Sequence, residues 1–169
     1  MDRMFTPWRL PYLEAMDKDT SCLFCRVLPE EQDESNLILQ RRDQVFVMIN
    51  LYPYSSGHLM VVPDRHLAHL SEATARERSL LMETVADCET ILRDIYRPDG
   101  MNVGMNLGRS AGAGVVGHLH IHLVPRWTGD NNFASVIGET RIIPETPPQT
   151  FQRLLPCFSA LEGEGTPHA

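Results

Sequence analysis

The sequence predicts an α+β protein, built on a mainly antiparallel sheet of about five strands with one long helix and a C-terminal helix. Residues 118–125 alternate histidine and aliphatic side chains, which is the two-residue period of a β-strand. Residues 71–96 instead repeat apolar side chains every three or four positions, as an amphipathic helix does. Several strands with one long helix between them are typical of the α+β class.

The first third of the chain is expected to contain a hairpin. Residues 1–36 are interrupted by prolines and predict irregular structure. Two strands should follow, from Val45 to Ile49 and from His58 to Val62, because both runs are dominated by apolar and β-branched residues. The proline- and glycine-containing turn between them indicates that the two strands pair as a hairpin.

The long helix is the clearest element of the sequence. Thr74 and Glu77 have the spacing of a capping box at its start. Its apolar face recurs at steps of four and three residues and consists of Leu81, Val85, Cys88, Leu92 and Ile95. Cys88 lies on that face, so we interpret it as a core residue. A Pro-Asp-Gly sequence at 98–100 should end the helix.

Three elements are expected after the helix. Residues from Met101 to Leu107 alternate like a strand, and a glycine-rich loop follows them. The histidine strand comes next. A short helix from Thr150 to Leu161 should complete the fold before a polar C-terminal end.

Length, charge and cysteine content limit the class of protein. A chain of 169 residues favours one domain with a sizeable core. The net charge of -7 argues against non-specific nucleic-acid binding and against a membrane-surface module, because both depend on basic patches. No apolar run approaches the ~20 residues of a membrane span, and the first residues do not resemble a secretory signal. Four cysteines are too few for a disulfide framework in this length, so we expect a cytoplasmic protein.

The histidine strand admits three explanations. His118, His120 and His122 share one face at a spacing of about 7 Å. They could be satisfied core or surface histidines, ligands of a catalytic metal, or the site of nucleophilic catalysis at phosphorus, with a covalent bond to one imidazole. The loop from Asn106 to Gly117 favours phosphorus, because glycines let backbone N–H groups converge on phosphate oxygens.

These residues resemble the histidine triad superfamily of nucleotide hydrolases and transferases. The sequence from His118 to Val124 is similar to the motif that gives the superfamily its name. Asn50 lies eight residues before His58, and the Val-Val-Pro sequence at 61–63 and Asn106 follow in the family's order. The similarity spans roughly residues 20–127, most of the chain. It implies one histidine triad domain over residues 1–169, with an irregular segment at 1–20 and a C-terminal extension at 128–169.

A finer resemblance concerns the bacterial branch close to diadenosine tetraphosphate phosphorylases. Three short sequences carry it: Pro7-Trp8-Arg9, Pro125-Arg126-Trp127 and the Gly-Asp-Asn-Asn-Phe run at 129–133.

The resemblance implies a role for each matching residue. His120 corresponds to the nucleophile, which attacks the α-phosphorus through a neutral nitrogen while its other nitrogen donates to a carbonyl, expected to be that of His118. His122 and His58 would contact phosphate oxygens. Asn50 would bind the ribose, although an asparagine at a turn or strand end is an equally good interpretation of Asn50 and Asn106. The remaining expected nucleotide-binding residues are Asn106, Gly108, Ser110, Gly112, Gly114 and Trp127.

The loop departs from the family at one point. Many members carry Gln-Ser or Gln-Thr shortly before the first histidine, where the side chain assists the leaving group. The corresponding residues 113–117 read Ala-Gly-Val-Val-Gly and offer no side-chain donor. Backbone N–H groups or Ser110 are candidates to substitute. The departure weakens the case for a phosphoramidase-like activity.

Cys22 and Cys25 form a Cys-x-x-Cys pair with several explanations. A thioredoxin-type redox motif needs a βαβ context that this region lacks, and two free buried cysteines are also possible. The resemblance implies a structural zinc site, because some superfamily members add the first triad histidine and a histidine after the Val-Val-Pro strand. Those positions are His118 and His66, which would complete four N/S ligands. His69 is an alternative ligand.

The sequence therefore predicts an enzyme that cleaves dinucleoside polyphosphates through a nucleotidyl-histidine intermediate. The acceptor in the second step is phosphate for a phosphorylase or water for a hydrolase. The alternatives are a nucleoside phosphoramidate-type hydrolase and a nucleotide-binding protein with little turnover. The resemblance also implies a homodimer.

Overall fold

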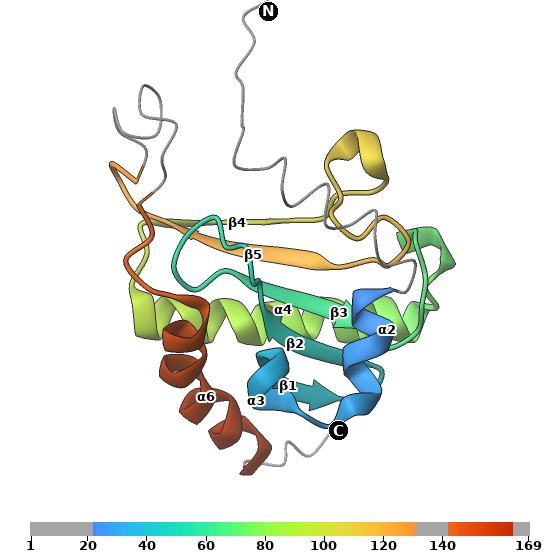
Figure 1. The fold of residues 1–169 in the computed structure, drawn as a ribbon, viewed down its shortest axis with the longest axis horizontal. Helices are drawn as coiled ribbons and strands as arrows, with labels where there is room; N and C mark the ends of the chain where they lie inside the picture. Colours follow the sequence, from blue (N-terminus) through green and yellow to red (C-terminus); the bar gives the residue numbers. More distant parts are fainter. Residues whose placement is uncertain (1–21, 131–141, 164–169) are drawn as a thin grey trace, which may run out of the picture.

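The computed structural model describes residues 22–130 and 142–163, and it contains a five-stranded antiparallel sheet (Figure 1). The strands lie in the order β1-β2-β3-β5-β4, and each neighbouring pair is antiparallel. Their bounds are β1 (Ile38–Arg42), β2 (Val45–Ile49), β3 (Leu59–Pro63), β4 (Gly100–Gly104) and β5 (Ile121–Arg126). The expected α+β class is confirmed.

Two long helices cover one face of the sheet. Helix α4 (Ala75–Tyr96) runs across β3 and β5, and α6 (Pro147–Gly163) contacts β1 and β2 (Figure 1). The larger hydrophobic core lies between them and the sheet, and its sheet residues include Val45, Val47, Leu59, Val61 and Ile121. This core fixes the strands from behind and leaves the opposite face for the site.

The opposite face carries a short helix, α2 (Leu23–Val27), followed along the chain by η2 (Leu28–Glu30) and α3 (Asp33–Asn36). A second hydrophobic cluster joins Phe24 of α2 to Phe46, Met48 and Met60 of the sheet. Side chains alternate along a strand, so these residues point away from α4. His122 is the register partner of Met60 and therefore lies on this same face.

The N-terminal prediction was wrong where it can be compared. Within residues 22–36, only Cys22, Glu31 and Gln32 lie outside the helical segments α2, η2 and α3. Strand β1 was not placed from the sequence either. It ends with three polar residues, Gln40-Arg41-Arg42, so the sequence lacks the apolar–polar alternation of a strand. The two arginines are accommodated by ion pairs with residues outside the strand, Arg41 with Asp33 and Arg42 with Asp87.

The strand that contains the histidines begins later than expected. Only His122 belongs to β5, whereas His118 lies at a bend and His120 in the irregular segment directly before the strand. Pro63 explains the difference, because proline has no N–H with which to continue the ladder between β3 and β5. The N–H of Leu119 donates instead to the carbonyl of Leu67, at 2.7 Å.

The remaining elements agree closely with the prediction. The hairpin of β2 and β3 is confirmed, with β3 displaced by one residue. Helix α4 starts at Ala75, because the capping box of Thr74 and Glu77 forms as expected, and a separate turn, η3 (Leu70–Glu72), precedes it. Strand β4 ends at Gly104, and the glycine-rich loop contains one helical turn, η4 (Arg109–Ala111). The C-terminal helix extends over Pro147–Gly163.

Some sequence predictions fall outside the described residues. These are the segment 1–20 with Pro7-Trp8-Arg9, and residues 131–133 of the Gly-Asp-Asn-Asn-Phe run. Among the helices of residues 22–130 and 142–163, none combines the length and the apolar character that a membrane crossing requires.

Candidate active site and metal cluster

A pocket of about 460 Å³ lies on the α2 face of the sheet. This volume is within the range of small-molecule sites. The pocket is lined from three directions, by α2, by the end of β2 with the turn after it, and by the glycine-rich loop with the histidines. The lining residues are Leu23, Phe24, Met48, Asn50, Leu51, Tyr52, Pro53, Tyr54, Met60, Asn106, Gly112, Gly114, Val115, His120 and His122. Among these lining residues, which come from the described part of the chain, there is no acidic residue, arginine or lysine, so the polar groups that they contribute are neutral dipoles.

His120 is held in one tautomer by the backbone. Its Nδ1 lies 2.8 Å from the carbonyl oxygen of His118, and a carbonyl oxygen only accepts. Nδ1 must therefore carry the proton, and Nε2 carries a lone pair. The residue is 4% exposed and lines the pocket, so this lone pair belongs to a buried ring at the pocket wall. Such a nitrogen is a nucleophile that no proton blocks.

His122 and His58 form a chain of hydrogen bonds that fixes the proton positions in both rings. The N–H of Tyr54 donates to Nδ1 of His58 at 3.0 Å, so His58 carries its proton on Nε2. That Nε2 donates to Nδ1 of His122 at 2.9 Å. His122 is consequently protonated on Nε2. It presents a neutral N–H donor to the pocket, the complement of the lone pair on His120.

All three rings are neutral near pH 7. Burial lowers the pKa of His58 to about 3, and the positive charge that His122 and His120 acquire when they are protonated lowers it further. Burial and the charge of His120 lower the pKa of His122 to about 4. Burial also lowers the pKa of His120, against the hydrogen bond to the His118 carbonyl. The site therefore keeps its lone pair and its donor without a net charge.

Two asparagines, Asn50 and Asn106, line the pocket. Asn50 follows β2, its N–H donates to the carbonyl of His58 at 3.0 Å, and its side-chain oxygen accepts from the N–H of Tyr52 at 2.9 Å. Its side-chain nitrogen lies 3.4 Å from Nε2 of His58, and because both atoms carry hydrogen this is a contact and not a hydrogen bond. Asn106 lines the pocket from the start of the glycine-rich loop, together with Gly112, which has a φ of 92° that disfavours other residues.

The structure does not bring every expected residue to this pocket. His58 and His118 are not part of the lining, but His58 contacts His122 and His118 contacts His120. Gly108 and Ser110 belong to the same loop but are not part of the lining. Trp127 packs its ring against Tyr96, with the ring centroids 6.3 Å apart, and does not line the pocket of this chain.

The sequence analysis missed the apolar wall of the pocket. Leu23, Phe24, Met48 and Met60 form much of it. The two methionines could have been assigned from strand alternation, because they share a face with His122. Leu23 and Phe24 lie almost one hundred residues from the histidines, and no periodicity in the sequence relates them.

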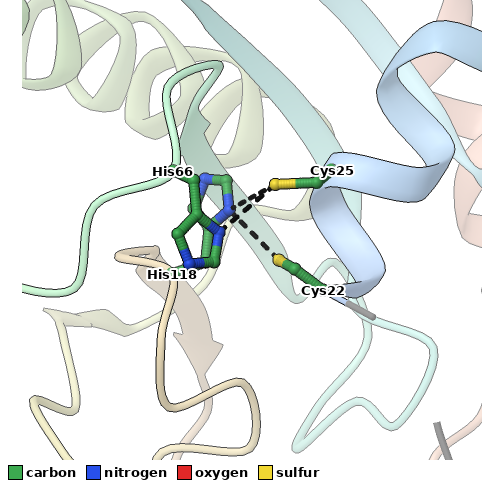
Figure 2. A group of neighbouring side chains, drawn as sticks. All are labelled: Cys22, Cys25, His66 and His118. Carbon is green, nitrogen blue, oxygen red and sulfur yellow. Dashed lines mark hydrogen bonds between the residues drawn. The ribbon is translucent and has the colours of Figure 1, made fainter. Parts of the chain in front are cut away.

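A second cluster lies beside the pocket and consists of Cys22, Cys25, His66 and His118 (Figure 2). Their sulfur and nitrogen atoms all lie within 4.8 Å of one another. Figure 2 shows both cysteines extending from the start of α2 towards the two imidazole rings. Cys22 Sγ is 3.2 Å from Nδ1 of His118, and Cys25 Sγ is 3.3 Å from Nδ1 of His66. His69 takes no part in the cluster and lies at the start of η3.

The donor set fits a tetrahedral zinc ion. Ligands at 2.0–2.3 Å from zinc in a tetrahedron are separated from one another by about 3.3–3.8 Å, close to the observed separations of 3.2–3.6 Å between sulfur and nitrogen. His118 is also in the correct tautomer. Its Nε2 donates to the carbonyl of Pro63 at 2.8 Å, so Nδ1, which faces the cysteines, carries the lone pair.

The fold and these two groups of side chains define a class of protein. A five-stranded antiparallel sheet and the segment that leads into β5 present alternate histidines beside a glycine-rich loop, and the middle imidazole, neutral and unprotonated at Nε2, lines a pocket. The chain belongs to the histidine triad family, and the HIT domain model matches residues 30–129.

Individual proteins of this family are similar to the chain in sequence and in structure. The chain is 40% identical over 152 residues to a protein named AP-4-A phosphorylase from Mycobacterium tuberculosis, covering 86% of this chain and 78% of that protein. A hypothetical histidine triad nucleotide-binding protein from Sulfolobus tokodaii superposes with a TM-score of 0.68 at 25% identity, covering 87% of this chain and 98% of the other. A zinc-bound histidine triad family protein from Mycobacterium smegmatis has the same fold, with a TM-score of 0.68 at 22% identity over 85% of this chain and 96% of the other.

Proposed function

We propose that this protein cleaves dinucleoside polyphosphates such as diadenosine tetraphosphate through a covalent nucleotidyl-histidine at His120. One observation carries the proposal. The backbone of His118 holds the proton of His120 on Nδ1, which leaves the Nε2 lone pair at the wall of a nucleotide-sized pocket. The relative from M. tuberculosis, which bears the name AP-4-A phosphorylase, supports the choice of substrate.

The reaction has two transfers. In the first, Nε2 of His120 attacks the α-phosphorus, a P–N bond forms, and the P–O bond to the rest of the substrate breaks. With diadenosine tetraphosphate the AMP moiety stays on the histidine, and the remainder of the substrate leaves as ATP. The N–H of His122 donates to the oxygen that gains charge, and His58 supports it through the hydrogen bond between the rings. Asn106 and the backbone N–H groups around Gly112 and Gly114 hold the other phosphate oxygens.

In the second transfer an acceptor attacks the same phosphorus and breaks the P–N bond. Inorganic phosphate as acceptor gives ADP, and water gives AMP. The apolar wall formed by α2 and the two methionines is suited to the base, because it offers dispersion contacts and no charge. Asn50, at the end of β2, is placed to hydrogen-bond the ribose.

We propose further that zinc occupies the cluster of Cys22, Cys25, His66 and His118. Four protein ligands leave no open coordination position, so the ion would serve structure and not activate water. The unprotonated Nδ1 of His118 and the sulfur–nitrogen separations support this assignment. Thiolate ligands require reduced cysteines, and free Cys22 and Cys25 fit a cytoplasmic protein.

The edge of the sheet supports a homodimer. Strand β4 is the outer strand beside β5, and Val103 and Leu107 are 47% and 41% exposed there. An edge strand with exposed apolar side chains is a surface on which a second copy can pair. Light scattering after gel filtration should give twice the chain mass, and Val103→Glu should reduce it to the mass of one chain.

The decisive assay offers the purified protein diadenosine tetraphosphate with and without inorganic phosphate and separates the products by chromatography. ATP with ADP identifies a phosphorylase, and ATP with AMP identifies a hydrolase. Binding of AMP without any product would contradict the proposed reaction and support a nucleotide-binding protein. Cleavage of an adenosine phosphoramidate but not of the tetraphosphate would support the other alternative.

A further inference from the structure

Helix α2 borders both the metal cluster and the pocket. Cys22 and Cys25, at its start, belong to the cluster, while Leu23 and Phe24 between them line the pocket. The helix has five residues. A helix this short is not stable in isolation, so the groups that anchor it determine where it lies. Two of its anchors are the cysteine side chains.

Phe24 contacts one histidine of each site. Its side chain is 1% exposed, and its ring centroid lies 5.2 Å from the centroid of His118 and 5.2 Å from that of His120. The interplanar angles are 76° and 55°, so both imidazoles meet the phenyl ring in inclined rather than stacked arrangements. The ring therefore lies between a metal ligand and the nucleophile, and it also forms part of the pocket wall.

From this geometry we infer that zinc at the four-residue cluster and a nucleotide in the pocket bind cooperatively, and that Phe24 is the positioning residue that couples them. The inference rests on the proposed function. Zinc fixes Cys22 and Cys25, these fix α2, and α2 holds the Phe24 ring against His120 and against the nucleotide. Without the ion, the two cysteines no longer hold the helix, and the pocket loses one wall.

Cooperativity of this kind is reciprocal. If zinc strengthens nucleotide binding by a given factor, the nucleotide must strengthen zinc binding by the same factor. We expect a factor of about ten, within the usual range for coupled sites. The test uses AMP as the nucleotide and zinc chloride as the metal. It measures binding, so it does not depend on turnover.

Two dissociation constants are measured by calorimetry and by competition with a chromophoric chelator. The dissociation constant of AMP should be about tenfold larger for the chelator-treated protein than for the zinc-loaded one. The dissociation constant of zinc should fall by the same factor when AMP is saturating. Circular dichroism at the titration temperature establishes that both forms are folded. Equal AMP constants with and without zinc overturn the inference.

Matched variants separate positioning from packing. Phe24→Leu should bring AMP affinity in the zinc-loaded protein close to that of the zinc-free form while zinc affinity without AMP stays near the wild-type value. Phe46→Leu is the control, because Phe46 is fully buried in the same cluster with its ring 6.3 Å from that of Phe24, yet it does not line the pocket. It should lower the melting temperature to a similar extent and leave the coupling intact.

The two variants also test the coupling if removal of zinc unfolds the protein, because both are compared in the zinc-loaded form. Equal AMP affinities for Phe24→Leu and Phe46→Leu would then overturn the inference. Failure of the zinc-loaded wild type to bind AMP or cleave diadenosine tetraphosphate contradicts the proposed function itself. AMP binding and cleavage that are both insensitive to zinc contradict only the coupling.

Discussion

The metal cluster and the pocket use histidines only two residues apart for opposite purposes. In His118 the Pro63 carbonyl accepts from Nε2, so Nδ1 faces the cysteines with a lone pair. In His120 the His118 carbonyl accepts from Nδ1, so Nε2 is the unprotonated nitrogen at the pocket. The residue type is the same in both places. The backbone carbonyl that accepts from each ring decides which nitrogen keeps its lone pair: Nδ1 of His118 towards the cysteines, and Nε2 of His120 at the pocket.

The comparison also explains why the two sites differ in composition. The cluster of Cys22, Cys25, His66 and His118 combines thiols with imidazoles, and partial burial with the neighbouring Cys22 raises the pKa of the Cys25 thiol, an effect that a bound cation would oppose. The pocket instead combines neutral imidazoles, amides and backbone groups. Four predictions, from the largest effect to the smallest, test this division of roles.

The largest effect is expected for His120→Asn. Loss of the nucleophile should reduce kcat for diadenosine tetraphosphate by at least about 10³-fold, while AMP still binds. His69→Asn is the matched control, because His69 is exposed and belongs to neither site. Turnover that survives in the His120 variant would assign the nucleophile to another group.

A smaller effect is expected for His122→Ala, which removes the N–H donor and leaves His120 in place. We expect kcat to fall by about 10²-fold, the usual cost of one donor that acts on developing charge, with a smaller change in KM. His58→Asn removes only the donor to Nδ1 of His122 and should cost less. If the rate of the His122 variant equals that of the wild type, leaving-group stabilisation comes from elsewhere, with the loop backbone as the first candidate.

Removal of zinc should act on stability before it acts on chemistry. Chelation or Cys25→Ser should lower the melting temperature by roughly 10 °C, because a closed four-ligand site contributes directly to folding. Cys157→Ser is the control for loss of a thiol outside the cluster. Abolition of turnover at an unchanged melting temperature would indicate a catalytic metal instead.

The smallest effect concerns pH and the buried pair His58 and His122. Their folded pKa values of about 3 and about 4 lie below the ordinary 6.5. Between these values the unfolded chain binds protons that the folded chain excludes, so stability falls as the pH falls below 6.5. Each histidine contributes up to about 1.4 kcal/mol per pH unit in this window.

Urea titrations from pH 7 to pH 5 measure this slope. His58→Asn should make the slope shallower than that of the wild type, and His69→Asn should leave it unchanged. Protonation of the metal ligands affects all three proteins alike, so the difference between them isolates His58. Identical slopes for the wild type and His58→Asn would show that His58 does not enter the native state as a buried neutral ring.

Local patterns predicted much of the fold and of the polar part of the site. The capping box, the apolar face of α4 and the hairpin depend on residues close in sequence, and all are observed. Strand β1 was missed because Arg41 and Arg42 are held by acids outside the strand, which no period reveals. The histidine segment was placed in a strand too early, because the effect of Pro63 on its pairing depends on tertiary structure.

The cluster of cysteines and histidines could be predicted from the sequence, whereas the apolar wall of the pocket could not. The four residues Cys22, Cys25, His66 and His118 were grouped by family resemblance, and the structure brings them together. Leu23 and Phe24 carry no chemical group that a motif would mark. Their place at the pocket follows only from the docking of α2 on the sheet, so sequence reasoning could name the reacting groups but not the surface that receives the base.

The most direct test traps the enzyme after the first transfer. Protein mixed with diadenosine tetraphosphate without added phosphate is quenched in alkaline detergent, which preserves phosphoramidates, and is then digested and mapped by mass spectrometry. We expect one AMP moiety on the peptide that contains His120, linked through Nε2, and none in His120→Asn. Turnover without such an adduct, or with AMP attached to a different residue, would contradict the central claim that the backbone of His118 prepares His120 for attack.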